Sequence, residues 1–84
     1  MPARLASIIL QLVEQDSIAT GDESYRILTR YTHEDLAFMI GAKRVAVSRA
    51  MKGLREAGAL RSGQRGSIVV GDVEALRRIA EKAA

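Results

Sequence analysis

Eighty-four residues, of which 48% are hydrophobic and 27% charged, allow one small globular domain with a thin core and exclude a wholly disordered chain. The formal net charge is +3, and because there is no cysteine and only one histidine, the sequence excludes disulfides, cysteine nucleophiles and cysteine zinc sites, so we expect no metal and no cofactor. No apolar run approaches the roughly 20 residues of a membrane span, and Glu14, Gln15 and Asp16 follow the first apolar run without a signal-peptide cleavage pattern, so a cytoplasmic location is the expectation.

The first third of the chain predicts a packing helix over residues 3–15 and then a hairpin over about 18–31. Apolar side chains recur at helical spacing in the first segment, at Leu5, Ile8, Ile9, Leu12 and Val13. Such a stripe could be a dimer seam, but a single amphipathic helix of this length is more often part of the core. Residues 16–24 are rich in turn formers and residues 25–31 in β-formers, so we expect the latter to pair with residues 18–20 across Gly21 and Asp22.

Residues 32–58 predict two helices joined by a tight turn. Thr32 is a candidate N-cap, and Asp35 three residues later completes a variant of the capping box, so a helix is expected over 33–40. Gly41 suits a helix end because glycine tolerates a positive φ. A second helix is expected over 43–57, since its apolar residues fall at i, i+3, i+4 and i+7, namely Val47, Ala50, Met51 and Leu54. Two short helices around a glycine turn form a helix-turn-helix.

The outer face of the second helix is the most informative surface in the sequence. At about 100° per residue, the face opposite the apolar stripe gathers Arg44, Val45, Ser48, Arg49 and Lys52. Arginine can bind guanine O6 and N7 with two hydrogen bonds, and a small apolar side chain can meet a thymine methyl group. We therefore predict DNA base reading by this face, from Arg44, Val45, Ser48 and Arg49. The alternative is an ordinary solvated helix face.

Residues 59–70 predict a second hairpin, the wing, and residues 73–83 a last helix. The expected strands cover about 59–62 and 67–70, with the turn at Gly63 to Gly66, and Asp72 is the expected cap of the helix. Phosphate contacts are predicted from the wing and the helix-turn-helix, at Thr32, His33, Lys43, Lys52, Arg61, Gln64 and Arg65. For the wing the alternative is a solubilising loop, and for Thr32 and His33 it is a simple cap with an exposed histidine.

Positive charge is concentrated in the centre of the chain. Residues 43–65 carry seven basic residues against Glu56 alone, a net +6, whereas residues 1–42 carry a net −3 and residues 66–84 balance. A basic centre on an otherwise neutral or acidic chain indicates a polyanionic partner. A membrane surface is a less suitable partner, because the basic helix lacks the large aromatic face of interfacial helices.

No arrangement of residues in the sequence points to catalysis, so we expect that the protein is not an enzyme. One histidine with scattered serines is expected by chance, and the adjacent Glu34 and Asp35 would point about 100° apart on a helix and form no shared acid–base site. Phe38 falls off the apolar stripe of its helix, and such an exposed aromatic side chain is more often without a role than a partner contact.

Residues 32–60 resemble the DNA-binding domain of the Crp/Fnr (catabolite activator) family of bacterial transcription regulators. The matching pattern is T-x-E-D-L-A-x-x-I-G from Thr32, K-R-V-A-V-S-R-A-M-K-x-L from Lys43 and G-A-L from Gly58, and the similarity runs over nearly the whole chain. The resemblance implies a winged helix-turn-helix fold, mostly α with small β-hairpins. It further implies a palindromic DNA operator bound by a homodimer of the full-length regulator, a sensor domain and dimerisation helix ahead of residue 1, and RNA polymerase as a candidate partner.

Two positions depart from the pattern of that family. Lys43 stands where serine is common, and Val45 stands where the catabolite activator has a glutamate that reads a base, so the half-site sequence does not carry over. The R-V-x-V-x-R run from Arg44 is closer to the cyanobacterial nitrogen-control branch of the family. Without a dimerisation helix, we expect the chain to be a fragment or a solitary domain, and a monomer in dilute solution.

The function that best fits the sequence is specific binding of double-stranded DNA by the output domain of a bacterial transcription regulator. Helix 43–57 would be the recognition helix in the major groove. The alternative is a winged helix for protein–protein contact, whose basic face serves an acidic partner. Salt-dependent binding that prefers one duplex over scrambled DNA would separate the two functions.

Overall fold

The computed structural model describes residues 2–62 and 66–82 and contains, within these ranges, four helices and four short strands. In chain order they are α1 (Pro2–Gln15), β1 (Ser17–Ala19), β2 (Tyr25–Ile27), α2 (His33–Ile40), α3 (Arg44–Glu56), β3 (Leu60–Ser62), β4 (Ile68–Val70) and α4 (Val73–Glu81). This order of elements, mostly helical with two small hairpins, confirms the fold class predicted from the sequence. No helix in the described ranges is long and apolar enough to cross a membrane.

The four strands form one antiparallel sheet in the order β1-β2-β4-β3. β1 pairs with β2 as the first hairpin, and β3 pairs with β4 as the base of the wing. The sequence did not predict the contact that joins the two hairpins, in which Tyr25 pairs with Val70 and Arg26 with Val69. β4 is therefore an inner strand of the sheet, and its Ile68 and Val70 side chains are buried.

The segment after β2 leaves the sheet earlier than the expected strand over residues 25–31. β2 ends at Ile27, and the next two backbone amides turn back to the end of α1. The Leu28 N–H donates to the Asp16 carbonyl at 2.8 Å, and the Thr29 N–H donates to Asp16 Oδ2 at 3.1 Å. The expected strand is too long because these amides have hydrogen-bond partners outside the sheet.

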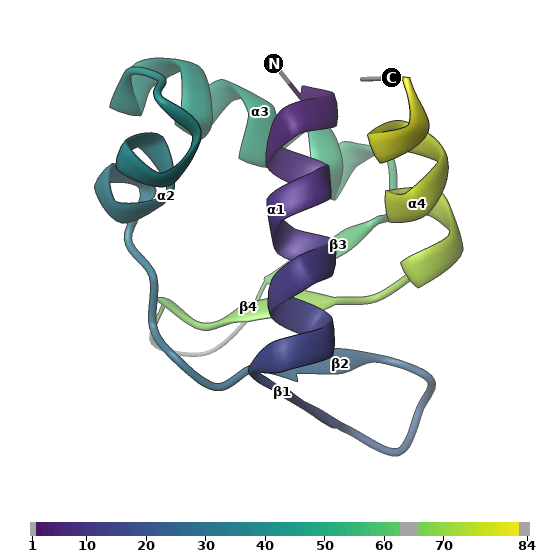
Figure 1. The fold of residues 1–84 in the computed structure, drawn as a ribbon. Helices are drawn as coiled ribbons and strands as arrows, with labels where there is room; N and C mark the ends of the chain where they lie inside the picture. Colours follow the sequence, from purple (N-terminus) through teal and green to yellow (C-terminus); the bar gives the residue numbers. More distant parts are fainter. Residues whose placement is uncertain (1, 63–65, 83–84) are drawn as a thin grey trace.

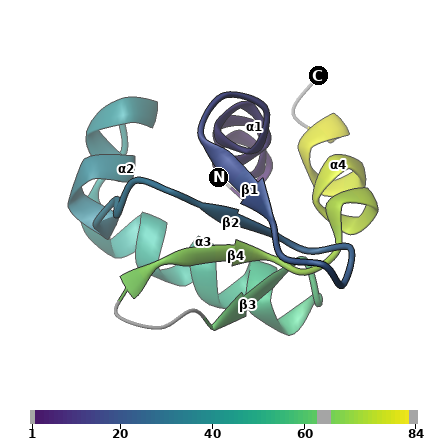
Figure 2. The same ribbon diagram turned by 90° about the horizontal axis from the view of Figure 1, so that it is seen from below.

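Helix α1 lies between α2 and α4 in both ribbon views (Figure 1 and Figure 2), and it contacts all three other helices and both strands of the first hairpin. Its Leu5, Ala6 and Ile9 side chains have no exposed surface. Complete burial of one leucine or isoleucine stabilises a fold by roughly 1.5–3 kcal/mol, so these side chains contribute a large part of the stability of a small domain. The predicted core role of this helix is confirmed.

The segment that contains α2, the turn and α3 has the caps that the sequence indicates. Thr32 Oγ1 accepts from the Asp35 N–H at 3.0 Å, and Asp35 Oδ2 accepts from the Thr32 N–H at 2.9 Å, which completes the capping box. Gly41 follows α2 in the left-handed region, at a φ of 67°. One contact was not predicted: the Arg4 guanidinium of α1 donates to the Ile40 carbonyl at 2.6 Å, which ties the end of α2 to α1.

Helix α3 buries one face and exposes the other. Its buried side chains are Val47, Ala50, Met51 and Leu54, the predicted apolar stripe. Because these side chains fill the same core as α1 and the inner strands, packing fixes the rotation of α3 about its own axis. The side chains on the opposite face of the helix are therefore held toward solvent.

Met51→Asp is expected to unfold the domain. Met51 is 4% exposed, and an unpaired buried carboxylate costs several kcal/mol, a large share of the roughly 5–15 kcal/mol that stabilises a typical domain. The matched control is Phe38→Asp, because Phe38 is 90% exposed and its replacement should change the free energy of unfolding by less than about 1 kcal/mol. Urea denaturation followed by circular dichroism measures both variants. A native unfolding curve for Met51→Asp would contradict the assignment of the buried face of α3.

Candidate nucleic-acid interface

The outer face of α3 holds several of the side chains that the sequence assigns to DNA. Arg44, Val45, Arg49 and Lys52 are all exposed. Val45 is 63% exposed, so an apolar side chain is left outside the core on this face. Lys43 is the N-cap residue of α3 and is also exposed, and its side chain makes no capping hydrogen bond. The structure thus brings these five residues together on one solvent-facing surface.

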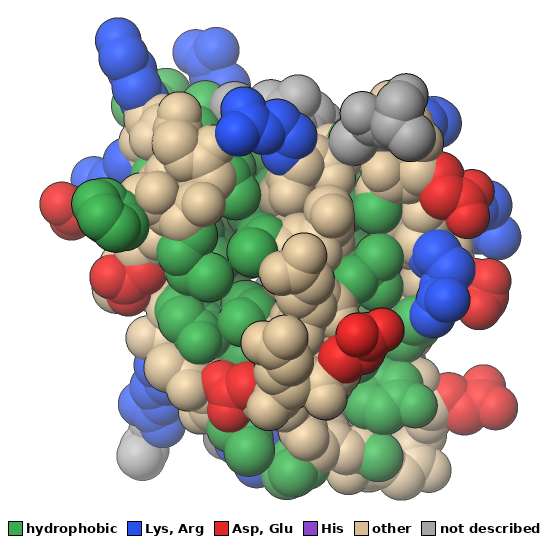
Figure 3. Space-filling view, viewed as in Figure 1, with side chains coloured by type: hydrophobic (Ala, Val, Ile, Leu, Met, Phe, Trp, Pro, Cys, Tyr) green, Lys and Arg blue, Asp and Glu red, His purple; other side chains and the backbone are tan. Residues whose placement is uncertain are grey.

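The positive charge of the helix-turn-helix comes from α3, whereas α2 carries two acidic residues and no Lys or Arg. In Figure 3, Lys and Arg side chains project from the upper edge, and others lie on the right side and at the lower left. Helix α3 itself carries four basic residues and a single acidic one, Glu56, at its last position. A surface of one sign raises the local concentration of a polyanion.

A groove of about 370 Å³ lies between the start of α2, helix α3 and the wing. Its walls include Arg30 and Thr32 ahead of α2, His33 at the first position of α2, Arg55 of α3 and Arg61 of β3. Among the described residues that line this groove, three are arginines and none is acidic, and we call it the basic groove. Among the described residues Arg30 and Arg55 have no ion-pair partner, so an anion bound near them would be stabilised.

His33 connects the two helices of the helix-turn-helix through its side chain. Its Nδ1 lies 2.8 Å from Ser48 Oγ on α3. Ser48 is partly buried. Its hydroxyl, which the sequence assigns to base reading, is also hydrogen-bonded to the imidazole. Partial burial lowers the pKa of His33 below its ordinary value, and repulsion from Arg55 and Arg44 lowers it further. His33 is therefore mainly neutral in the free protein at pH 7.

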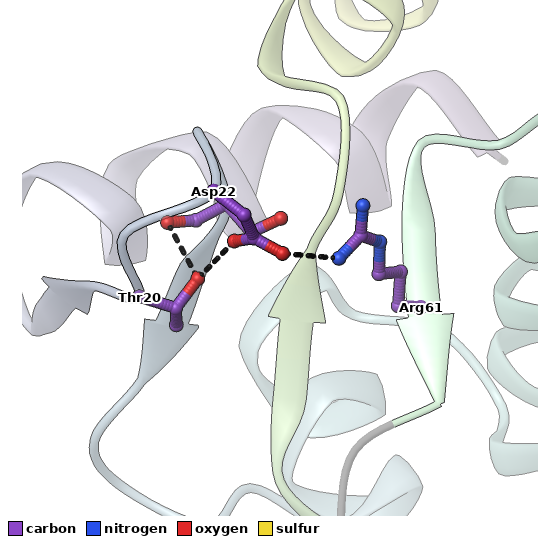
Figure 4. A network of polar contacts seen from close by, with 4 residues as sticks. Thr20, Asp22 and Arg61 are labelled. Carbon is purple, nitrogen blue, oxygen red and sulfur yellow. Dashed lines mark hydrogen bonds and ion pairs between the residues drawn. The ribbon is translucent and has the colours of Figure 1, made fainter.

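The Arg61 side chain, predicted to contact a phosphate, is bound to the first hairpin in this structure. Its Nη1 donates to Asp22 Oδ2 at 2.8 Å, and Thr20 Oγ1 donates to the other carboxylate oxygen (Figure 4). These hydrogen bonds, the one from Thr20 foremost, hold the pKa of Asp22 well below its usual range. Arg61 passes close to Gly71, where an added Cβ atom would lie 2.9 Å from its side chain. Gly71 therefore provides the room for this contact.

Two residues of the basic groove received no role from the sequence. Arg55 follows Ser48 by seven positions, which is about two helical turns, so helical spacing could have placed it on the same side of α3. Arg30 lies in the segment between β2 and α2, for which no spacing rule predicts a side-chain direction. The predicted wing-tip residues Gln64 and Arg65 lie outside the described residues.

Known proteins share this arrangement of helices, turn and wing. A family model for the Crp-like helix-turn-helix domain matches residues 3–79. The chain belongs to that family. The match confirms the resemblance, which the sequence indicated over nearly the whole chain, so α2 and α3 are the two helices of a Crp-like helix-turn-helix. No match was found among curated protein sequences.

Solved structures with the same Crp-like fold include those of a transcriptional regulator, a transcription factor and CprK. TTHA1359, a transcriptional regulator of the CRP/FNR family from Thermus thermophilus, is 28% identical with a TM-score of 0.81, over 96% of this chain and 40% of that one. CooA, a CO-dependent transcription factor from Carboxydothermus hydrogenoformans, is 19% identical with a TM-score of 0.84, over 94% of this chain and 36% of that one. CprK, in complex with o-chlorophenolacetic acid, is 22% identical with a TM-score of 0.81, over 95% of this chain and 33% of that one. The Crp-like domain described here therefore spans less than half the length of these proteins.

Thr20→Val is expected to raise the pKa of the Asp22 carboxyl toward the ordinary value of about 3.9, because the Thr20 hydrogen bond is the main cause of the lowered pKa. A carboxyl whose pKa is lowered by folding stabilises the fold above the unfolded pKa and loses that contribution as the pH falls. The variant should therefore lose less stability than the wild type between about pH 4 and pH 2. Carbon-13 NMR titration of Asp22 measures the pKa, and the control is Thr29→Val, since Thr29 is exposed and its N–H donates to Asp16 and not to Asp22. An unchanged titration in Thr20→Val would contradict the hydrogen bonding seen in Figure 4.

Proposed function

We propose that this Crp-like domain is the output domain of a transcription regulator and that it binds a specific double-stranded DNA sequence with α3 in the major groove. The observation that carries the proposal is the outer face of α3, whose cationic and apolar side chains are exposed while the opposite face is buried. Family membership supports DNA binding as the activity of the domain. The exposed face adds the chemical groups that distinguish base pairs in the major groove.

Helix α3 has dimensions that suit this role. Its 13 residues give a length of about 20 Å at 1.5 Å per residue. The major groove of B-DNA is about 12 Å wide and admits one α-helix. In helix-turn-helix complexes the first helix crosses the DNA backbone, and the N-terminal residues of the second helix contact base edges. The residues within the first two turns of α3 are therefore the proposed base readers: Arg44, Val45, Ser48 and Arg49.

The proposed base readers combine two cations with one apolar and one small polar group. Arg44 and Arg49 can each donate two hydrogen bonds to O6 and N7 of a guanine, and such a contact discriminates against a wrong base by roughly 1–3 kcal/mol. Val45 can place its methyl groups against a thymine methyl. Ser48 can donate or accept a hydrogen bond, so the base it prefers depends on its contact with His33.

Phosphate contacts in this proposal surround the base-reading residues. Lys43 precedes α3 and Lys52 lies in its third turn, so the two ammonium groups flank the reading face along the helix. Thr32 accepts the Asp35 N–H with its hydroxyl oxygen and can still donate its hydroxyl hydrogen to a phosphate. His33 follows it and lines the basic groove. Contacts of this kind fix the register of a protein on DNA without selecting a sequence.

The wing adds basic residues to the same surface. Arg61 and Asp22 are 54% and 56% exposed, and a phosphate has to compete with the Asp22 carboxylate for the Arg61 guanidinium. Exposed ion pairs contribute little to stability, so this exchange is not costly. Gln64 and Arg65 keep the phosphate-binding role that the sequence predicts for them.

The proposal extends to a homodimer on a palindromic operator. The regulators with the same fold are more than twice as long as this chain, so the domain fits the output end of a larger protein. Two helix-turn-helix modules in a dimer contact half-sites about 34 Å apart. Joining two such modules raises apparent affinity by ~10²–10⁴ through effective concentration. One domain alone then contacts one half-site, and RNA polymerase is the candidate protein partner of the DNA-bound regulator.

Selection of bound sequences from a random duplex pool tests the proposed function. We expect enrichment of one half-site and binding that weakens with salt, because each phosphate contact contributes about −0.9 to the slope of log K against log salt. A double variant, Arg44→Glu with Arg49→Glu, keeps the buried face of α3 and serves as the control that enriches no sequence. A folded wild-type domain that enriched nothing would overturn the proposal and favour the alternative, an acidic protein partner on the same basic face.

Arg49→Ala is expected to weaken binding to the selected duplex by ~1–3 kcal/mol and to relax the choice at one base pair. The matched comparison is Lys52→Ala, which should weaken the selected and a scrambled duplex about equally and lower the salt slope by roughly one unit. Fluorescence anisotropy on both duplexes over a series of salt concentrations measures these effects. Equal weakening by Arg49→Ala would make Arg49 a phosphate contact, and a changed base preference in Lys52→Ala would contradict its assignment to the backbone.

A further inference from the structure

The contact between His33 and Ser48 joins two parts of the interface that the proposed function uses separately. His33 is the first residue of α2 and lines the basic groove, where a DNA phosphate is expected. Ser48 lies on α3 among the proposed base readers. At 2.8 Å, Nδ1 of His33 and Oγ of Ser48 share one hydrogen bond, in which either group can be the donor. In the neutral tautomer that carries its proton on Nε2, Ser48 donates to Nδ1, so protonation of Nδ1 reverses the direction of this hydrogen bond.

The groups around His33 disfavour a positive imidazole in the free protein. The cationic side chains on the neighbouring elements are Arg30 before α2, Arg44 and Arg55 on α3, and Arg61 on β3. The other titratable groups on α2 and in the segment before it are Tyr31, Glu34 and Asp35. Glu34 is exposed, and the Asp35 carboxylate is bonded to the Thr32 N–H at 2.9 Å, so neither carboxylate is a hydrogen-bond partner of the imidazole. Among the described residues, neither Arg30 nor Arg55 has an ion-pair partner.

A phosphate bound in the basic groove reverses this electrostatic balance. An anion within about 4–6 Å of a titratable group favours its charged form, and it also offsets the repulsion from the arginines. A protonated imidazole donates a hydrogen bond from both ring nitrogens. Because Nδ1 already faces Ser48, the second ring nitrogen of His33 is left for the phosphate.

We propose that His33 is a positioning residue, which takes up a proton when a DNA phosphate occupies the basic groove and then donates from Nδ1 to Ser48 Oγ. The Ser48 oxygen then accepts from the imidazolium, so the hydroxyl hydrogen is directed to a base acceptor in the major groove, such as guanine O6 or N7. When Nδ1 is unprotonated, the same hydrogen is donated to His33 instead. The proton comes from solvent, and only an N–H bond is formed. The coupling rests on the proposed DNA-binding function and adds a link between the phosphate contact and the base contact.

Proton uptake makes DNA affinity depend on pH. Since the complex holds a proton that the free protein lacks at pH 7, affinity rises as the pH falls, by up to about tenfold per pH unit. The rise begins at the pKa of His33 in the complex and levels off below its lower pKa in the free protein. His33 is the single histidine of the chain, so no other side chain has an ordinary pKa in this range.

The experiment measures affinity for the selected duplex and for a scrambled duplex of equal length between about pH 5.5 and pH 7.5 at constant ionic strength. For the wild type we expect both affinities to rise toward low pH and the ratio between them to change. His33→Asn places an amide near the position of Nδ1 but cannot titrate, so its binding should not depend on pH. Ser48→Ala should keep the pH-dependent affinity and lose the change in the ratio. If His33 had only a structural role, His33→Asn would change the affinity, but the dependence of affinity on pH would be the same as in the wild type.

NMR titration of the His33 imidazole in the wild-type protein gives a second measurement that needs no variant. The pKa should be higher in the complex than in the free protein. An affinity that does not vary with pH, on a duplex that the protein still prefers over scrambled DNA, would overturn the coupling and leave the proposed function standing. A pH dependence that persists in His33→Asn would also overturn it. If the protein bound the selected and the scrambled duplex equally at every pH, both the coupling and the proposed function would be overturned.

Discussion

The side chains that α1 and α3 bury in one common core are the constraint on which the rest of the domain depends. They are Leu5, Ala6 and Ile9 from α1 and Val47, Ala50, Met51 and Leu54 from α3. A chain of 84 residues can form only one core, so neither helix can turn about its axis without exposing apolar surface. The direction of the outer face of α3 is therefore decided by the residues behind it, and the Arg4 bond to the Ile40 carbonyl holds α2 in the same frame.

Backbone pairing holds the wing to the rest of the domain in a comparable way. β4 is bonded on both sides, to β3 and to β2, so the base of the wing cannot shift without breaking hydrogen bonds to the first hairpin. Helix α3 and the wing are thus two fixed walls, and the basic groove between them keeps Arg30 and Arg55 near His33. Like charges held in fixed positions repel one another in the free protein. An anion that binds between them removes this repulsion, so a rigid scaffold favours the bound state.

The sequence predicts the parts of this fold that local signals determine. Thr32, Asp35 and Gly41 mark the ends of α2 because caps and left-handed residues act within a few positions of the chain. The β2–β4 pairing has no such signal, since its partners are far apart in the sequence and come together only when the core forms. The same is true of the side-chain contacts made by Arg4, His33 and Arg61. Their residue types indicate what they can bind, but packing of distant elements decides which partner they find.

Gly71 shows how a missing side chain can set the charge pattern of a surface. A Cβ atom at this position would lie 2.9 Å from Arg61, whose flexible stem would have to move aside. The main effect of such a substitution would be electrostatic and remote: a guanidinium released from Asp22 adds an unneutralised positive charge beside the wing, and a carboxylate is uncovered on the first hairpin. A Gly71→Ala substitution would thereby shift positive potential toward the wing and negative potential toward the first hairpin, while the net charge of the domain and the proposed base-reading side chains stay the same.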